Sequence, residues 1–405
     1  MAETPTETPA VAAPARPWGL GWEPAAFVML LLYPLFPVFE SLFFSLTNRS
    51  LGDQLPTVFI FAVLALGLNV VVGYTGLLHL GIAAFFAIGA YVAGILTADE
   101  YPFRLPFVVA LVAGPLVAAA AGLLLGAPTL RLRGDYLALV TLGFGEVTRY
   151  TLKNLDAVTA GTRSISPVPP PPSFNGTLDW ATDYRPFYYL TLLILIGVAV
   201  LLRNLERSRL GRSWVALRED ELAAYCMGLN PTKLKLAAFA LGAGLAGLAG
   251  VLYATRLTST ASPDAYDFNR SIFMLCCVIL GGLGSRQGVL LGVFLLLGFD
   301  NILSPILDGK IQQYTGGAEA LPVRAFGRTL VDLPAIMFTF TGWRLAVFGL
   351  ALILVMRYRP EGLIPNDRVR HELHPDEANG PGVRPVTIGN STGEIQALGR
   401  KGGTA

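Results

Sequence analysis

Ionisable side chains that could contact a soluble partner are concentrated in one stretch of the chain, residues 203–235. This stretch lies between two long apolar runs, so it must be in water if those runs cross a membrane. Its first half is rich in arginine, which is typical of cytoplasmic loops. Three consecutive acids, Glu219, Asp220 and Glu221, follow the arginines. The stretch is therefore the part of the chain best suited to meet a soluble protein.

The same stretch predicts two short helices. Asp220 can accept hydrogen bonds from the free amides of a helix start, where acids also favour the helix dipole. Gly228 is placed to end that helix, and Asn230 followed by Pro231 is typical of the start of the next one. The alternative interpretation is a solvated loop whose charges only set the topology of the chain.

Motifs for enzymatic chemistry are missing from the sequence. It has no Gly-x-x-x-x-Gly-Lys-Ser/Thr phosphate loop, so the chain should not bind or hydrolyse ATP itself. It has no serine or cysteine nucleophile with a plausible base, and no convincing set of metal ligands. We therefore expect no enzyme activity, no cofactor and no metal on this chain. The apolar runs also lack the carboxylate relay of a proton-coupled carrier.

The composition indicates a membrane protein. Apolar residues make up 53% of the chain and charged residues only 14%, against about 25% in a typical soluble domain. The mean hydropathy is +0.55. A net charge of +2 is too small to suggest nucleic acid binding. We predict an all-α polytopic membrane protein with about eight to ten transmembrane helices, some of them broken or re-entrant.

The hydrophobic runs divide the chain into one membrane domain with two polar tails. We predict crossings near residues 24–45, 56–73, 77–97, 106–127, 135–149, 187–202, 236–253, 271–284, 289–306 and 343–356, and a re-entrant segment at 333–340. Residues 1–22 are predicted to be a disordered tail and residues 360–405 a polar cytoplasmic tail. The membrane domain is then 23–359, and the basic residues place both termini in the cytoplasm.

One glycine-rich stretch predicts a break between two membrane helices. Its chemistry-bearing residues are Asn69, Gly73, Gly76, His79 and Gly81. Broken helices at membrane depth are tolerated only against protein or a water-filled cavity. His79 is an ionisable group in an apolar segment, which makes it a candidate for the transport path. A neutral, hydrogen-bonded histidine at a helix break is the alternative.

A second stretch combines small residues with one acid: Thr141, Gly143, Gly145 and Glu146. Two glycines and a threonine in an apolar run permit tight helix packing. Glu146 can neutralise Arg149, three residues later on a helix. A structural ion pair at the outer membrane surface is the alternative to substrate contact.

A third group, which predicts a packing face on a later helix, comprises Gly242, Gly244, Gly247 and Gly250.

Several of these motifs resemble one protein family. Glu221, Ala223, Ala224 and Gly228 resemble the Glu-Ala-Ala…Gly cytoplasmic motif of ABC importer permeases, and the run from Thr141 through Glu146 to Arg149 is similar to the LivM-type permeases of branched-chain amino acid importers. The resemblance covers roughly residues 22–365. His79 departs from the family pattern, which usually has serine there.

The resemblance implies a function and a set of partners. The implied ATPase-coupling residues are Arg218, Glu219, Asp220, Glu221, Ala223, Ala224 and Gly228. The implied partners are a second, LivH-type permease, two ATP-binding subunits that carry the ATP, and a periplasmic amino-acid-binding protein. The implied setting is the lipid bilayer of a bacterial inner membrane. Transport would then proceed by alternating access driven by the ATPases.

Two alternatives stay open on the sequence alone. The first is an ion-coupled secondary carrier, which needs no ATPase and depends on a buried carboxylate. The second keeps the ABC permease but changes its cargo, because related permeases move urea or short amides instead of leucine, isoleucine and valine.

Overall fold

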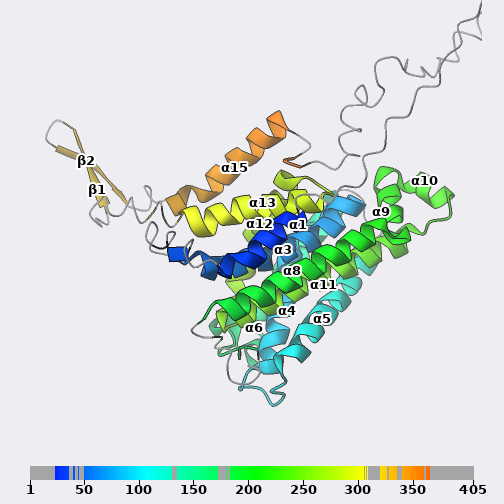
Figure 1. The fold of residues 1–405 in the computed structure, drawn as a ribbon, viewed down its shortest axis with the longest axis horizontal. Helices are drawn as coiled ribbons and strands as arrows, with labels where there is room; N and C mark the ends of the chain where they lie inside the picture. Colours follow the sequence, from blue (N-terminus) through cyan, green and yellow to red (C-terminus); the bar gives the residue numbers. More distant parts are fainter. Residues whose placement is uncertain are drawn as a thin grey trace, which may run out of the picture.

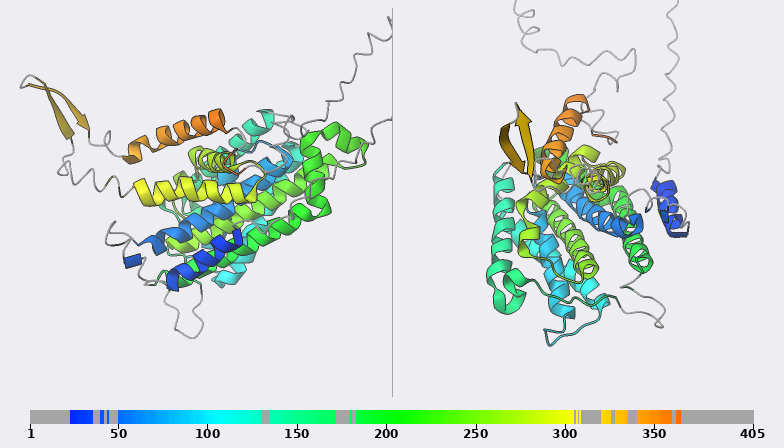
Figure 2. Two further views of the ribbon diagram at one scale, coloured as in Figure 1. Left: turned by 45° about the horizontal axis from the view of Figure 1, so that its top comes forward. Right: turned by 90° about the vertical axis from the view of Figure 1, so that its left-hand side faces the viewer.

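A computed structural model describes residues 23–35, 40–41, 44, 50–129, 135–171, 180, 183–304, 306, 308, 320–325, 328–334, 340–359 and 362–364. The predicted tails, residues 1–22 and all of 360–405 except 362–364, lie outside the described residues. Most of the longer helices lie alongside one another in one bundle (Figures 1 and 2). The predicted α-helical membrane architecture is therefore confirmed.

The elements follow one another along the chain as α1 (Glu23–Leu32), η1 (Tyr33–Leu35), α3 (Leu51–Asn69), the π-helix η2 (Val70–Tyr74), α4 (Ile82–Thr97), α5 (Phe107–Thr129), α6 (Asp135–Asn154), α7 (Asp156–Thr159), η3 (Gly161–Arg163), α8 (Arg185–Arg207), α9 (Arg209–Glu219), α10 (Glu221–Cys226), α11 (Pro231–Leu257), η5 (Pro263–Tyr266), α12 (Phe268–Gly281), α13 (Arg286–Gly298), the π-helix η6 (Phe299–Leu303), β1 (Ala320–Ala325), β2 (Arg328–Pro334) and α15 (Phe340–Tyr358).

Four helices among the described residues are long and apolar enough to cross a membrane: α3 with η2, α5, α8 and α11. The helices α4 and α12 are apolar but shorter. The predicted crossing at 77–97 begins only at Ile82, because residues 76–81 leave helical geometry. This is the helix break that the glycine pattern predicted.

The C-terminal third differs most from expectation. Strands β1 and β2 pair antiparallel, with Val323 opposite Val331, and form a hairpin that lies away from the helical body (Figures 1 and 2). The sequence analysis predicted no strand here and predicted a re-entrant segment at 333–340. Residues 333 and 334 of the predicted re-entrant segment instead end β2, and residue 340 begins α15. Residues 335–339 lie outside the described residues. The apolar residues Leu321 and Val323, and likewise Val331 and Leu333, are two positions apart, which is the period-two pattern that could have indicated strands.

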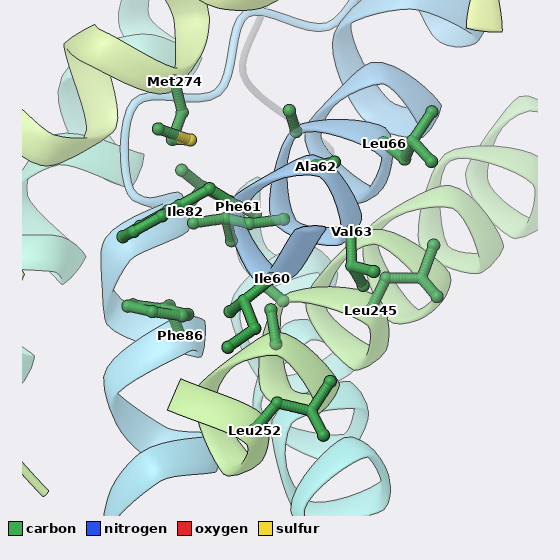
Figure 3. Packing of buried hydrophobic residues seen from close by; sticks show 14 of the residues in the cluster. Ile60, Phe61, Ala62, Val63, Leu66, Ile82, Phe86, Leu245, Leu252 and Met274 are labelled. Carbon is green, nitrogen blue, oxygen red and sulfur yellow. The ribbon is translucent and has the colours of Figure 1, made fainter. Parts of the chain in front are cut away.

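The core is organised around α3, which is buried on all sides from Val58 to Asn69. Figure 3 shows Phe61 of α3 beside Ile82 and Phe86 of α4, and Val63 near Leu245 of α11. The rings of Phe61 and Phe86 lie 5.7 Å apart between centroids. A helix that is apolar around its whole circumference belongs inside a bundle, and α3 has that composition.

Close crossings of α11 with its neighbours require glycine. A Cβ added at Gly250 would overlap the backbone carbonyl of Phe86 on α4, and one at Gly247 would meet α5 at Ala118 and Gly114. Gly242 faces Gly67 of α3 in the same way. The packing face predicted from the glycine spacing is therefore confirmed at these positions, whereas Gly244 has only ordinary contacts around it.

Substituting Gly250 by alanine should destabilise the bundle. The added methyl group overlaps backbone, which cannot rotate away, so we expect a loss of about 1–3 kcal/mol in the free energy of unfolding. The thermal midpoint of the detergent-solubilised protein measures this loss. The matched control is Gly197→Ala on α8, where an added Cβ meets nothing within 4 Å. Equal midpoints for the two variants would contradict the crossing geometry.

Candidate coupling site and helix break

The segment after α8 forms two short helices with well-defined ends. The Ser208 hydroxyl accepts a hydrogen bond from the Gly211 amide at the start of α9. Asp220 Oδ1 accepts from the amides of Leu222 and Ala223 at 2.8 and 3.0 Å and so starts α10. Gly228 follows α10 with a φ of +83°, a value that favours glycine. The helix pair predicted from sequence is confirmed.

The next helix begins as predicted, and its start holds α10 in place. Asn230 Oδ1 accepts from the Lys233 amide at 3.1 Å, and Pro231 occupies the first turn of α11. Lys235 Nζ lies 2.7 Å from Glu221 Oε1, with the lysine side chain only 9% exposed. Burial makes this pair less screened than a surface pair. Glu221, which the sequence assigned to docking, therefore also joins α10 to α11.

Apolar side chains are exposed on α10 and just after it. Leu222, Tyr225 and Met227 are 73%, 65% and 82% exposed. Glu219, Asp220, Ala223 and Gly228 are exposed as well, whereas Ala224 is buried. Figure 1 shows α9 and α10 at the edge of the bundle, away from the β-hairpin. This protruding segment, residues 208–230, presents an apolar face that no described part of the chain covers.

Arg218 differs from the other residues assigned to coupling. Its guanidinium Nη1 donates to the carbonyl of Gly73 in η2 at 2.5 Å, and the Arg218 residue is partly buried. The side chain therefore extends back into the bundle. The sequence grouped Arg218 with the docking acids because nothing in a linear pattern shows which way a side chain on a short helix turns.

The helix break brings together residues far apart in sequence. The Leu80 amide donates to Thr141 Oγ1 of α6 at 3.1 Å, and the Ala83 amide donates to Ser271 Oγ of α12 at 3.2 Å. A Cβ built at Gly145 would lie 3.6 Å from Gly81, while one at Gly143 would meet nothing within 4 Å. The two glycine-rich stretches thus meet at Gly81. Asn69 and Gly73 lie instead at the other end of the break, beside Gly284.

His79 lies at this break but makes no hydrogen bond. It is 1% exposed, and neither ring nitrogen has a partner among the described residues. Its neighbours explain this, because the rings of Phe85 and Phe239 lie 5.6 and 5.4 Å away and offer no polar group. His79 lies at the break as expected, and no described residue supplies the expected hydrogen bond.

Glu146 takes part in an ion-pair network. Arg149 Nη2 lies 2.8 Å from Glu146 Oε2, and its Nη1 lies 2.8 Å from Asp264 Oδ1. Lys153 Nζ lies 3.2 Å from the other Asp264 oxygen. The hydrogen bond from Lys153, together with the charge of Arg149, holds the pKa of Asp264 below its ordinary value. The geometry favours the structural interpretation of Glu146. Asp264 could not be found from sequence, because it lies 115 residues from Arg149.

A small hollow, partly open and with a volume of only about 10 Å³, lies between α4, α6 and α12. It is lined by Leu80, Ala83, Leu142, Gly145, Glu146, Tyr266, Asp267, Phe268 and Ser271. No group of three or more His, Cys, Asp or Glu side chains able to hold a metal occurs in the part of the chain that the structure describes. The described chemistry is thus one of helix contacts and docking surfaces.

Sequence comparisons place this architecture in a known family. The family described as branched-chain amino acid transport system / permease component matches residues 50–356. The chain belongs to this family. It is therefore a membrane permease component and not an enzyme. Membership implies ATPase and binding-protein partners for this permease.

Named relatives support the same assignment. The permease is 38% identical over 355 residues to the high-affinity branched-chain amino acid transport system permease protein LivM of Salmonella typhimurium, covering 83% of this chain and 75% of the relative. It is 37% identical over the same length to LivM of Escherichia coli, with the same coverage. The ribose import permease protein RbsC of Escherichia coli is 28% identical over 281 residues, or 67% of this chain and 82% of the relative. No solved structure gave a significant match.

Replacing His79 by phenylalanine should stabilise the permease. An unmade polar contact in a buried site carries a penalty of about 1–3 kcal/mol, which an apolar ring of similar shape removes. We expect a higher thermal midpoint for His79→Phe in detergent. The matched control is Asn69→Leu, which removes a buried side chain whose oxygen does accept a hydrogen bond, and it should lower the midpoint. A lower midpoint for His79→Phe would show that the histidine has a polar partner in the folded protein.

Proposed function

We propose that the permease is the translocating subunit of an ATP-driven importer for branched-chain amino acids. The observation that carries the proposal is the uncovered apolar face of α10, held on a water-exposed segment between two membrane-length helices. A contiguous exposed apolar face on a soluble segment marks a contact with another protein. The names of the relatives support the choice of cargo.

The geometry of α10 suits a helix that inserts into a groove of a motor subunit. Leu222 and Tyr225 are three residues apart and share one face of the helix, and Met227, just beyond the helix end, is exposed as well. The cap by Asp220 and the pair between Glu221 and Lys235 both hold the N-terminal end of the helix in place. A fixed helix loses little conformational freedom on docking, which favours binding.

The complete assembly in this proposal has further parts. The permease domain, residues 23–359, pairs with a second permease of LivH type, and two ATPase subunits bind the ATP. A periplasmic binding protein delivers the amino acid to the face opposite α10. The setting is a bacterial inner membrane with the 208–230 segment and both termini in the cytoplasm, as the arginine-rich loop favours.

Transport by reconstituted vesicles tests the function. The permease, its second permease and the ATPases are placed in proteoliposomes with ATP inside and binding protein outside. We expect uptake of labelled leucine that isoleucine and valine compete with and that ribose, urea and acetamide do not. Uptake by the permease alone on a proton or sodium gradient would identify an ion-coupled carrier instead, and competition by urea or acetamide would assign a different cargo.

Docking through α10 has a separate test. Met227→Asp places a charge in the proposed contact, so we expect loss of ATPase co-purification by at least about tenfold and loss of uptake, because an unpaired interfacial charge is costly. The control is Thr232→Asp, an exposed residue at the start of α11 on the same side of the protein. Both variants should be recovered from the membrane in normal amounts. Normal co-purification of Met227→Asp would contradict docking through the apolar surface that α10 and Met227 present.

A further inference from the structure

The π turn, defined here as residues 70–74 of η2, receives a side chain from the docking segment. Arg218, the penultimate residue of α9, donates to the Gly73 carbonyl at 2.5 Å. The Arg218 side chain passes close to Gly76, where an added Cβ would lie 3.1 Å from Arg218 Cγ. A charged donor on a carbonyl is among the stronger hydrogen bonds in proteins. The link therefore joins α9 directly to the end of the central helix α3.

A second contact joins the same turn to the docking segment. The Tyr74 hydroxyl donates to Glu206 near the end of α8, and Arg286 Nε lies 2.7 Å from the same carboxylate oxygen. The Tyr74 ring also stacks on Trp214 of α9 with planes 11° apart. Trp214 is anchored in turn, because its Nε1 donates to the Leu234 carbonyl at 2.8 Å. Movement of α9 cannot occur without displacing Tyr74 or breaking these contacts.

The π turn is also attached to the cytoplasmic ends of α12 and α13. Asn69, the last residue of α3 before the π turn, accepts through its Oδ1 from the Gly284 amide at 3.0 Å in the turn between those helices. Within the π turn itself, a Cβ added at Gly73 would lie 2.7 Å from the same Gly284 nitrogen. Asn69 is completely buried, so its orientation is fixed by packing. One turn of helix thus receives contacts from α8, α9 and the α12–α13 turn, and it leads directly into the break at 76–81.

A π turn is a suitable place for a movement to enter a helix. It contains one residue more than an α-helical turn, and such insertions occur often at functional sites. A small shift at the π turn changes the register of a helix next to it without unfolding that helix. In this chain the helix that precedes is the buried α3 and the segment that follows is the break.

We propose that Arg218 is a positioning residue that transmits motor-driven movement of α9 and α10 to the π turn, and that it does not itself bind the motor. The inference rests on the proposed function, because it requires an ATPase on α10. Tyr74, through Glu206, acts in parallel. Motor docking and transmission to the membrane helices are then carried by different residues of one short segment.

The experiment compares Arg218→Ala with Arg212→Ala in the reconstituted importer. Arg212 lies on the same helix and is exposed. Within the described part of the chain, its side chain donates a hydrogen bond only to the Arg207 carbonyl. For Arg218→Ala we expect normal ATPase co-purification and continued ATP hydrolysis, with at least about a tenfold fall in leucine taken up per ATP. Arg218→Lys should recover part of the ratio, since an ammonium can still donate to the carbonyl. Arg212→Ala should leave the ratio unchanged.

A second readout separates transmission from simple stabilisation. In the wild-type complex, hydrogen exchange of amides 70–76 should differ between the nucleotide-free and ATP-bound states, and Arg218→Ala should abolish this difference. If the Arg218→Ala protein is not recovered from the membrane, the same exchange difference is measured in Tyr74→Phe. That substitution removes only a hydroxyl and keeps the ring stacked on Trp214.

Each result has one meaning. Loss of ATPase binding in Arg218→Ala would make Arg218 a docking residue and overturn the inference. An unchanged ratio of uptake to hydrolysis, or an unchanged exchange difference, would overturn it as well. Failure of the wild-type permease to bind any ATPase would instead overturn the proposed function, independently of Arg218.

Discussion

A backbone that leaves helical geometry inside an apolar bundle must find hydrogen-bond partners within the protein, and this constraint organises the permease. Between α3 and α4 the chain gives up regular helix at residues 76–81. The backbone polar groups around this interruption form hydrogen bonds with the side chains of Thr141 of α6, Ser271 of α12 and Arg218 of α9. Each partner comes from a different helix, so the break fixes where those helices lie. An unsatisfied group at membrane depth would cost several kcal/mol.

The helices can meet the break only because α11 lets them approach one another. Gly242, Gly247 and Gly250 allow the backbones of α3, α5 and α4 to come into direct contact with α11. Without a hydrophobic driving force between helices in lipid, such close packing is the main source of attraction. The central position of α3 follows, since it is the helix enclosed by the others.

Between the docking face and the break, the same contacts serve stability and movement. The 208–230 segment is rigid in itself, through the cap by Asp220 and the Glu221–Lys235 pair, and it is attached to the bundle by Trp214 and Arg218. A rigid segment attached at defined points transmits a displacement, whereas a loosely held loop would absorb it. Under the proposed function, the apolar face of α10 is the place where a partner applies that displacement.

The sequence by itself determined the membrane class, the ends of α10 and α11, and the interruption after Gly73. These features depend on local chemistry: apolar run length, a capping Asp or Asn, and glycine where φ is positive. The tertiary structure alone decided that Arg218 turns inward, that Glu146 pairs in a network with Asp264, that His79 lies between two phenylalanines, and that residues 320–334 contain a hairpin. Those outcomes depend on contacts between residues distant in sequence, such as the 145 positions that separate Gly73 from Arg218, and no local pattern records which distant groups packing will bring together.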